Sequence, residues 1–126
     1  MSSAAATLEV LRAAAEVLAG RGGPAALATV IARTGSAPQV VGARLLLRAD
    51  GVMVGTVGGG AIELQVLAAC RAALRDGHPQ VVKAHLVRDL GMCCGGAMEV
   101  FVEYLDAQAR LVLIGGGHVA QALAPV

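Results

Sequence analysis

Three glycine-rich clusters divide this sequence of 126 residues into short segments. They lie at residues 55–60, 91–96 and 115–117. Glycine has no Cβ and adopts positive φ angles readily, so such a cluster marks a tight turn or a place where the backbone approaches another group closely. We therefore expect short strands and helices that are connected through these clusters.

Two segments have the spacing of amphipathic helices. In residues 4–19 and 61–75, apolar side chains recur every three or four positions, as one buried helical face requires. The expected buried face of the first helix comprises Leu8, Leu11, Ala15 and Leu18. The expected buried face of the second comprises Ile62, Val66, Leu67, Cys70 and Leu74.

The other apolar segments predict strands. Asp50-Gly51 is a strong hairpin turn signal between the two strands that flank it. In the last long strand, Val100 and Val102 face one way, and Glu99, Phe101 and Glu103 face the other. The expected strands cover residues 26–33, 44–48, 52–57, 81–87, 98–105 and 110–114. These elements predict an α+β fold, with a mixed sheet flanked by helices.

Composition excludes several classes of function. The net charge is +1, no basic run occurs, and aromatic residues make up only 2% of the chain, so binding of DNA or RNA is not expected. The sequence contains neither a signal peptide nor an uncharged apolar stretch of 18 residues, so no membrane span is expected. Three cysteines, two of them adjacent, are a poor disulfide framework and indicate a reducing cytoplasm.

The first glycine cluster joins a predicted strand to a predicted helix. Gly58, Gly59 and Gly60 would leave backbone N–H groups open at the helix start, which favours an anionic ligand. Glu63 lies in the first helical turn, where a carboxylate suits the helix dipole. A tight turn with Glu63 as a capping charge is the alternative.

The second cluster contains the adjacent pair Cys93 and Cys94, followed by Gly95 and Gly96. Adjacent Cα atoms are about 3.8 Å apart, which is too close for an ordinary disulfide. Spacing for a zinc site is absent. One of the two thiols could instead bind a soft metal centre, or both could fill apolar space. Cys70 lies on the apolar helical face and is expected only to fill apolar space in the core.

Two further segments contain candidate ligand contacts. Ser36 and Arg44 could donate hydrogen bonds to an anion, or lie in a plain turn. Gly115 and Gly117 match a dinucleotide-binding fingerprint after a short apolar strand. The expected acidic residue about 20 positions later lies beyond Val126. We therefore expect a truncated chain, with an NAD(P)-dependent oxidoreductase fragment as one alternative and a structural module without ligand as another.

Taken in order, the motifs resemble the XdhC/CoxI family. The sequence reads TGSAP at 34–38, GAR at 42–44, GTVGGGAIE at 55–63, GMCCGGAMEV at 91–100 and LIGGGHV at 113–119. The resemblance runs from about residue 26 to residue 124, and 91–99 is its most specific part. Gln39 stands where the family often has Arg.

The resemblance implies two domains, a cofactor-handling domain over 1–106 and the first strand and glycine turn of a Rossmann-like domain over 107–126. It also implies a maturation factor without catalytic residues of its own. Such a protein binds molybdenum cofactor (molybdopterin), supports its sulfuration and inserts it into a xanthine dehydrogenase-type apoenzyme. A cysteine desulfurase is an implied partner, and a homodimer is the implied assembly. A nucleotide would be a second ligand if the Rossmann part were complete.

The phosphate, dithiolene and oxo-metal groups of that cofactor suggest hypotheses for the roles of particular residues. Cys93 or Cys94 would lie near the metal. Backbone donors would come from Gly58, Gly59 and Gly60 and from Gly95 and Gly96. Glu63 would hold either a loop or a cofactor amine.

Overall fold

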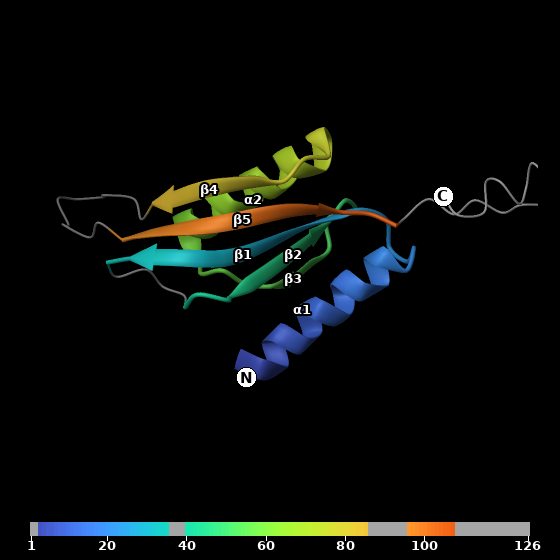
Figure 1. The fold of residues 1–126 in the computed structure, drawn as a ribbon, viewed down its shortest axis with the longest axis horizontal. Coiled ribbons are helices and arrows are strands. Elements are labelled where there is room, and N and C mark those ends of the chain that lie inside the picture. Colours follow the sequence, from blue (N-terminus) through green and yellow to red (C-terminus); the bar gives the residue numbers. More distant parts are fainter. Residues whose placement is uncertain (1–2, 36–39, 86–95, 108–126) are drawn as a thin grey trace, which may run out of the picture.

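A computed structural model describes residues 3–35, 40–85 and 96–107 of the chain. The described elements are two helices and one five-stranded sheet (Figure 1). In chain order they are α1 (Ser3–Leu18), β1 (Ala25–Thr34), β2 (Arg44–Arg48), β3 (Met53–Gly55), α2 (Gly60–Asp76), β4 (Gln80–His85) and β5 (Ala97–Leu105). Within this part of the chain no helix has both the length and the apolar character needed to cross a membrane.

The sheet has the strand order β3-β2-β1-β5-β4. All four strand pairs are antiparallel. The α+β class and the flanking helices are thus confirmed. The expectation of a mixed sheet was wrong, because the described strands pair only antiparallel. The hairpin at Asp50-Gly51 sets the direction of β2 and β3, while no local signal fixed the direction in which β5 inserts between β1 and β4. The predicted strand 110–114 lies outside the described residues.

Two apolar clusters cover the two faces of the sheet. The larger lies between the sheet and α2, and the smaller lies between the sheet and α1. From α2 the buried residues are Ile62, Val66, Ala69, Cys70 and Ala73. Leu67 and Leu74 pack at the margin of the same cluster, so the predicted face of this helix is confirmed with a small rotation.

The predicted face of α1 was wrong. Val10, Ala14 and Val17 are its buried residues, whereas Leu8, Leu11 and Leu18 are about half exposed, at 48%, 47% and 52%. Both stripes have helical spacing, so periodicity alone could not separate them. The smaller valine and alanine side chains allow the helix to lie close to β2 and β3.

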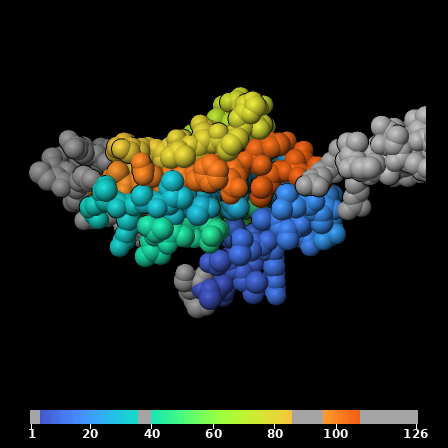
Figure 2. Space-filling view, viewed as in Figure 1, coloured from blue at the N-terminus to red at the C-terminus, as the bar shows by residue number. Residues whose placement is uncertain are grey.

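Helix α1 covers only part of its face of the sheet. Figure 1 shows it beside β2 and β3, with α2 behind β4 and β5. Ala25 and Leu27 of β1 and Leu105 of β5 still pack with α1, whereas no described element covers β4 or the remainder of β1 and β5 on this side, which is turned to the viewer in Figure 2. Glu99, Phe101 and Glu103 lie on this side, as the alternation in β5 predicted.

Candidate functional site

One end of the sheet gathers the segments that contain most of the predicted site residues. In the strand register, Thr34 at the end of β1 pairs with Ala97 at the beginning of β5. Ala97 pairs in turn with His85 at the end of β4. In the sequence, residues 36–39 follow the end of β1, and residues 86–95 lie between the end of β4 and the beginning of β5. We call this row the loop end of the sheet.

Ser36, Cys93, Cys94 and Gly95 belong to those two segments and lie outside the described residues. Gly96 is described, and it is buried directly before β5. The structure thus defines the strand ends from which the predicted cysteine loop departs and to which it returns.

The first glycine cluster also lies at the loop end. Helix α2 runs antiparallel to β4, and its first turn lies beside the end of that strand because the carboxamide of Gln65 bonds both backbone groups of His85. Gln65 Nε2 donates to the His85 carbonyl at 2.6 Å, and the His85 N–H donates to Gln65 Oε1 at 3.1 Å. The side chain therefore ties the start of α2 to the residue that precedes the cysteine loop.

The start of α2 is open. Gly59 is the N-cap residue, and no side-chain hydrogen bond caps the helix there. Gly60 has a φ of +62°, and a Cβ built at Gly59 or Gly60 would meet no atom of the described residues within 4 Å. The first N–H groups of a helix have no partner within the helix, so this terminus suits an oxygen-rich anion.

Thr56 and Glu63 hold the cluster in shape. Thr56 Oγ1 lies 2.6 Å from both Glu63 Oε2 and the Gly58 carbonyl oxygen, and it accepts the Gly58 N–H at 3.1 Å. A hydroxyl has one proton, so Thr56 donates to one of the two oxygens at a time. Of the two alternative roles of Glu63, holding the loop is therefore the one for which the structure shows a hydrogen-bond partner, the Thr56 hydroxyl.

Gly55 is the first residue of the same cluster, but here glycine is required because neighbouring groups pack closely against it. Its φ is +80°, and a Cβ there would lie 2.4 Å from the Arg44 carbonyl oxygen and 2.5 Å from Val10 Cγ2. Only glycine lets α1, β2 and β3 approach this closely. At Gly55 the glycine therefore allows close packing at the end of β3, where it pairs with Leu45.

Arg44 occupies the opposite face of the sheet from α2. Its neighbours Leu45 and Leu47 belong to the cluster under α2, and alternation turns Arg44 the other way. Its guanidinium Nη1 donates to the Gly42 carbonyl at 3.1 Å. The structure therefore does not bring Arg44 together with Gly58, Gly59 and Gly60.

The third glycine cluster, with Gly115 and Gly117, lies outside the described residues. Strand β5 runs away from the loop end, and Leu105 pairs with Ala25 at the opposite end of the sheet (Figure 1). The described part of β5 thus ends at the opposite end of the sheet from the first glycine cluster.

Comparison with known proteins settles the family. The family model described as "XdhC and CoxI family" matches residues 18–85, more than half of the chain. The chain belongs to the XdhC and CoxI family. The matched region contains α2 and its glycine cluster.

Two relatives of this XdhC/CoxI-family chain are informative. The uncharacterized protein YqeB of Escherichia coli (strain K12) is 41% identical over 105 residues, which is 80% of this chain and 19% of YqeB. A crystal structure described as a xanthine dehydrogenase from Bacillus halodurans is 30% identical, with a TM-score of 0.59 over 71% of this chain and 28% of that one. The chain spans about a fifth to a quarter of the length of these relatives.

Sequence reasoning missed two residues that shape the start of α2. Thr56 is part of the quoted motif, and a hydroxyl two residues before Gly58 is a signal for a local side-chain turn. Gln65 gave no comparable signal, because its partner His85 is 20 residues away. His85 itself is exposed.

The prediction that Cys70 fills apolar space in the core is confirmed. It is a free thiol with 0% exposure on the buried face of α2. Burial raises the pKa of the Cys70 thiol to about 11, against a partial lowering by Arg71. The thiol therefore stays protonated and unreactive at neutral pH. Among the described ranges, no three His, Cys, Asp or Glu side chains lie close enough to hold a metal ion.

Proposed function

We propose that this chain is the cofactor-handling part of an accessory protein that binds molybdenum cofactor, supports its sulfuration and inserts it into a xanthine dehydrogenase-type apoenzyme. The observation that carries the proposal is the loop end of the sheet, where β4 ends and β5 begins beside the start of α2, with Cys93 and Cys94 between these two strands in the sequence. Membership of the XdhC and CoxI family supports it, as does the likeness to a structure described as a xanthine dehydrogenase.

The described residues fit the anionic parts of such a cofactor. Phosphate and oxo groups are best bound by backbone N–H groups at a helix start or a glycine turn. Gly58, Gly59 and Gly60 provide such a start, and a Cβ built at Gly59 or Gly60 would meet no atom of the described residues within 4 Å. Thr56 and Glu63 keep this turn in shape before any ligand arrives.

The remaining roles follow from the chemistry of the ligand. When bound, molybdenum cofactor supplies a dithiolene-held metal centre that takes up a sulfido ligand. We propose that Cys93 or Cys94 lies near that metal, because a thiolate is a soft ligand. Gly95 and Gly96 would add backbone donors, and Ser36 and Arg44 would contact an anionic group. No residue is proposed as catalytic.

The proposal extends to domains and partners. Residues 1–106 would form the cofactor-handling domain, and 107–126 would begin a Rossmann-like domain in which Gly115 and Gly117 contact a nucleotide. A cysteine desulfurase would deliver sulfur, the apoenzyme would receive the cofactor, and the chain would act as a cytoplasmic homodimer. The NAD(P)-dependent oxidoreductase alternative rests on 115–120 alone, and no described residue favours it.

The cysteine experiment tests this function directly. The protein is purified from a molybdenum-sufficient host and assayed for molybdenum and for oxidised pterin fluorescence. We expect both in the wild type and a loss in Cys93→Ala, in Cys94→Ala or in the double variant. Unchanged retention and transfer in all three variants would exclude the thiol role. Absence of molybdenum and pterin together with bound nucleotide would favour the oxidoreductase alternative.

A glycine pair provides a matched control for the helix start. Gly60 and Gly77 stand at the two ends of α2 with φ angles of +62° and +71°, and neither has an atom within 4 Å of a built Cβ. Alanine therefore causes similar backbone strain at both sites. We expect Gly60→Ala to lose cofactor and Gly77→Ala to retain it at comparable stability. Equal retention would leave Gly60 as a turn residue only.

A further inference from the structure

Helix α1 has a second apolar stripe that lies outside the described core. Leu8, Leu11 and Leu18 of this stripe are each about half exposed, and Ala4 and Ala15 are exposed members of the same row. The spacing of the row alternates between three and four residues, which is the a/d pattern of a coiled-coil seam. We call this row the leucine stripe. A seam of this kind is complete only when a second helix packs against it.

The leucine stripe faces the uncovered side of the sheet. Figure 1 shows α1 in front of the sheet and antiparallel to β1. Successive side chains of a right-handed helix advance clockwise by about 100° when the helix is viewed from its N-terminus. The leucine stripe therefore lies roughly 110° clockwise from the buried stripe of the same helix. This rotation turns it toward the viewer of Figure 1, the side on which β4 and parts of β1 and β5 are uncovered.

An apolar row of the sheet lies beside α1 on the same side. Thr29 of β1 pairs with Phe101 of β5, and Phe101 pairs with Val81 of β4. Val81 is 58% exposed, and Phe101, the single phenylalanine of the chain, is only partly buried. We call this row the open floor. Strands are about 4.8 Å apart and packed helices about 8–10 Å, so β5 and β4 together have the width of one further helix.

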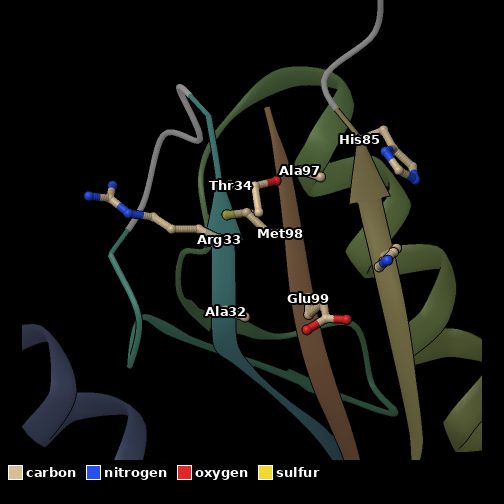
Figure 3. Close-up of a pocket in the computed structure, with 8 residues that line it drawn as sticks. Ala32, Arg33, Thr34, His85, Ala97, Met98 and Glu99 are labelled. Atoms are coloured by element: carbon tan, nitrogen blue, oxygen red, sulfur yellow. The ribbon is translucent and has the colours of Figure 1, made fainter. Parts of the chain in front are cut away.

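The loop end of this side is polar instead. A cleft of about 430 Å³ lies there, lined by the ends of β1 and β4 and the beginning of β5 (Figure 3). Thr34, Lys83 and Glu99 contribute its polar groups, and Figure 3 shows the Glu99 carboxylate on the open side of β5. Apolar docking on this side is therefore limited to the leucine stripe and the open floor.

The two apolar surfaces are too small to act separately. A stable protein interface buries about 800 Å² on each partner. Three half-exposed leucines fall well short of this area, and so does a single row of three residues. An occupant that binds stably must therefore cover the leucine stripe and the open floor together.

We propose that the occupant is a second copy of this chain, with α1 of each copy lying on the open floor of the other. Each copy has one ridge, the leucine stripe, beside one groove, the open floor. A two-fold axis parallel to α1 places each ridge in the groove of the other copy, which closes the assembly as a dimer. The inference rests on the homodimer of the proposed function and names the surface that forms it.

The symmetry fixes how the two helices meet. Rotation about an axis parallel to α1 preserves the direction of the helix, so the two α1 helices lie side by side, parallel and in register. Leu11 then contacts the partner's Leu11, and Leu18 contacts the partner's Leu18, as in a parallel coiled-coil seam.

The rise along α1 determines which residues meet the partner's sheet. Val10 is about level with Gly55, because a Cβ built at Gly55 would touch it, and Gly55 lies in the cross-strand row of Ala28. A helix rises about 1.5 Å per residue and a strand about 3.4 Å, so two helical residues correspond to about one strand residue. Leu8 is therefore about level with the open floor, and Arg12 with the next row toward the beginning of β1.

That row contains Glu103, which pairs with Leu27. In the described ranges the side chains of Arg12 and Glu103 make no hydrogen bond or ion pair. Arg12 lies one helical turn after Leu8, at the polar border of the leucine stripe, so in the dimer it points to the partner's β5. Arg12 thus pairs with the partner's Glu103, and the two-fold axis forms this ion pair twice.

The test measures the dimer dissociation constant of the full 126-residue chain by analytical ultracentrifugation. We expect the wild type to dimerise, and Leu11→Glu to raise the constant at least about thirtyfold because two carboxylates would be buried at the seam. Leu64→Glu is the matched control and should leave the constant unchanged, since Leu64 is 66% exposed on α2, at the opposite face of the sheet. Equal constants for the two variants would overturn the proposal. So would a monomeric wild type, which would leave the surface to a helix of another protein.

A charge exchange tests the register of the two copies. Arg12→Glu and Glu103→Arg should each raise the dissociation constant about tenfold, because each change brings two pairs of like charges together. The double variant restores opposite charges and should return close to the wild-type value. Both side chains lie outside the core, and circular dichroism of each variant shows whether the fold is intact. A double variant no tighter than the single variants would rule out this placement of α1.

The same proteins separate the interface from the cofactor role. Molybdenum and pterin are measured in the wild type and in Leu11→Glu. A wild type that dimerises through Leu11 but contains neither would refute the cofactor role while the interface stands. A monomeric wild type that contains both would refute the interface and the homodimer while the cofactor role stands.

Discussion

Replacing Gly55 by alanine should destabilise the fold more than the same change at any exposed glycine turn. The added Cβ would lie 2.4 Å from the Arg44 carbonyl oxygen and 2.5 Å from Val10 Cγ2. Ordinary carbon contacts begin near 3.5 Å, so the groups must separate by about 1 Å. Val10 is only 1% exposed, and it cannot move aside without disturbing the smaller core cluster.

Two terms set the size of the effect. Overpacking a core costs about 1–3 kcal/mol. The φ of +80° at Gly55 adds about 1–2 kcal/mol for a residue with a Cβ. Together they predict a loss of about 2–5 kcal/mol, a large part of the stability of a small domain. The melting temperature should fall by about 8 °C or more.

The control is Gly51→Ala in the hairpin turn. Gly51 has a φ of +93°, but a Cβ built there meets no atom of the described residues within 4 Å. Gly51→Ala should therefore lose stability through backbone strain alone. Urea unfolding of both variants then isolates the packing term. A second check combines Gly55→Ala with Val10→Ala, and the two losses should be less than additive. Equal losses in Gly55→Ala and Gly51→Ala would refute the close approach of α1 to β3.

Three further predictions follow from described contacts. Gln65→Leu should speed hydrogen exchange at His85 and cost about 1 kcal/mol in stability, and unchanged exchange at His85 would contradict the Gln65 contact. With Cys93 and Cys94 replaced by alanine, Cys70 should react with iodoacetamide only after unfolding, and rapid labelling of the native protein would rule out its burial. The pKa of the Cys70 thiol is about 11 in the folded state, above the value near 8.5 of an unfolded thiol. The free energy of unfolding should therefore fall as pH rises from about 9 to 11. Hydrogen bonds from the Val52 N–H and then from Arg48 lower the pKa of the Asp50 carboxyl, so NMR titration should place this pKa below its usual range. Asp50→Ala should remove a small stabilisation that the wild type loses as pH falls through the lowered pKa. An Asp50 titration at the ordinary value would argue against the turn geometry.

Local signals were sufficient for most elements of the fold. Both helices, the hairpin at Asp50-Gly51 and the described strands occur within a few residues of their predicted bounds. Helical and strand periodicity, glycine turns and proline breaks all act over short stretches, so they can be read along the chain. The order of the motifs also sufficed to predict the family.

The candidate site was predictable only in part. Gly58–Gly60 could be recognised because a glycine run before an amphipathic helix is a local pattern. The tie between Gln65 and His85 and the row of strand ends at Thr34, Ala97 and His85 join residues that are far apart in the sequence. Their assembly requires the register of the sheet, which no short window contains.

By itself, the sequence determined which segments become helices and strands, where the backbone must turn and which family the chain resembles. Tertiary structure alone decided that Val10 and not Leu8 faces the core, that Gly55 must be glycine, and that the sheet is antiparallel throughout. The physical reason is that propensity and periodicity are local. Burial depends on which surfaces meet, and both apolar stripes of α1 would have satisfied periodicity equally well.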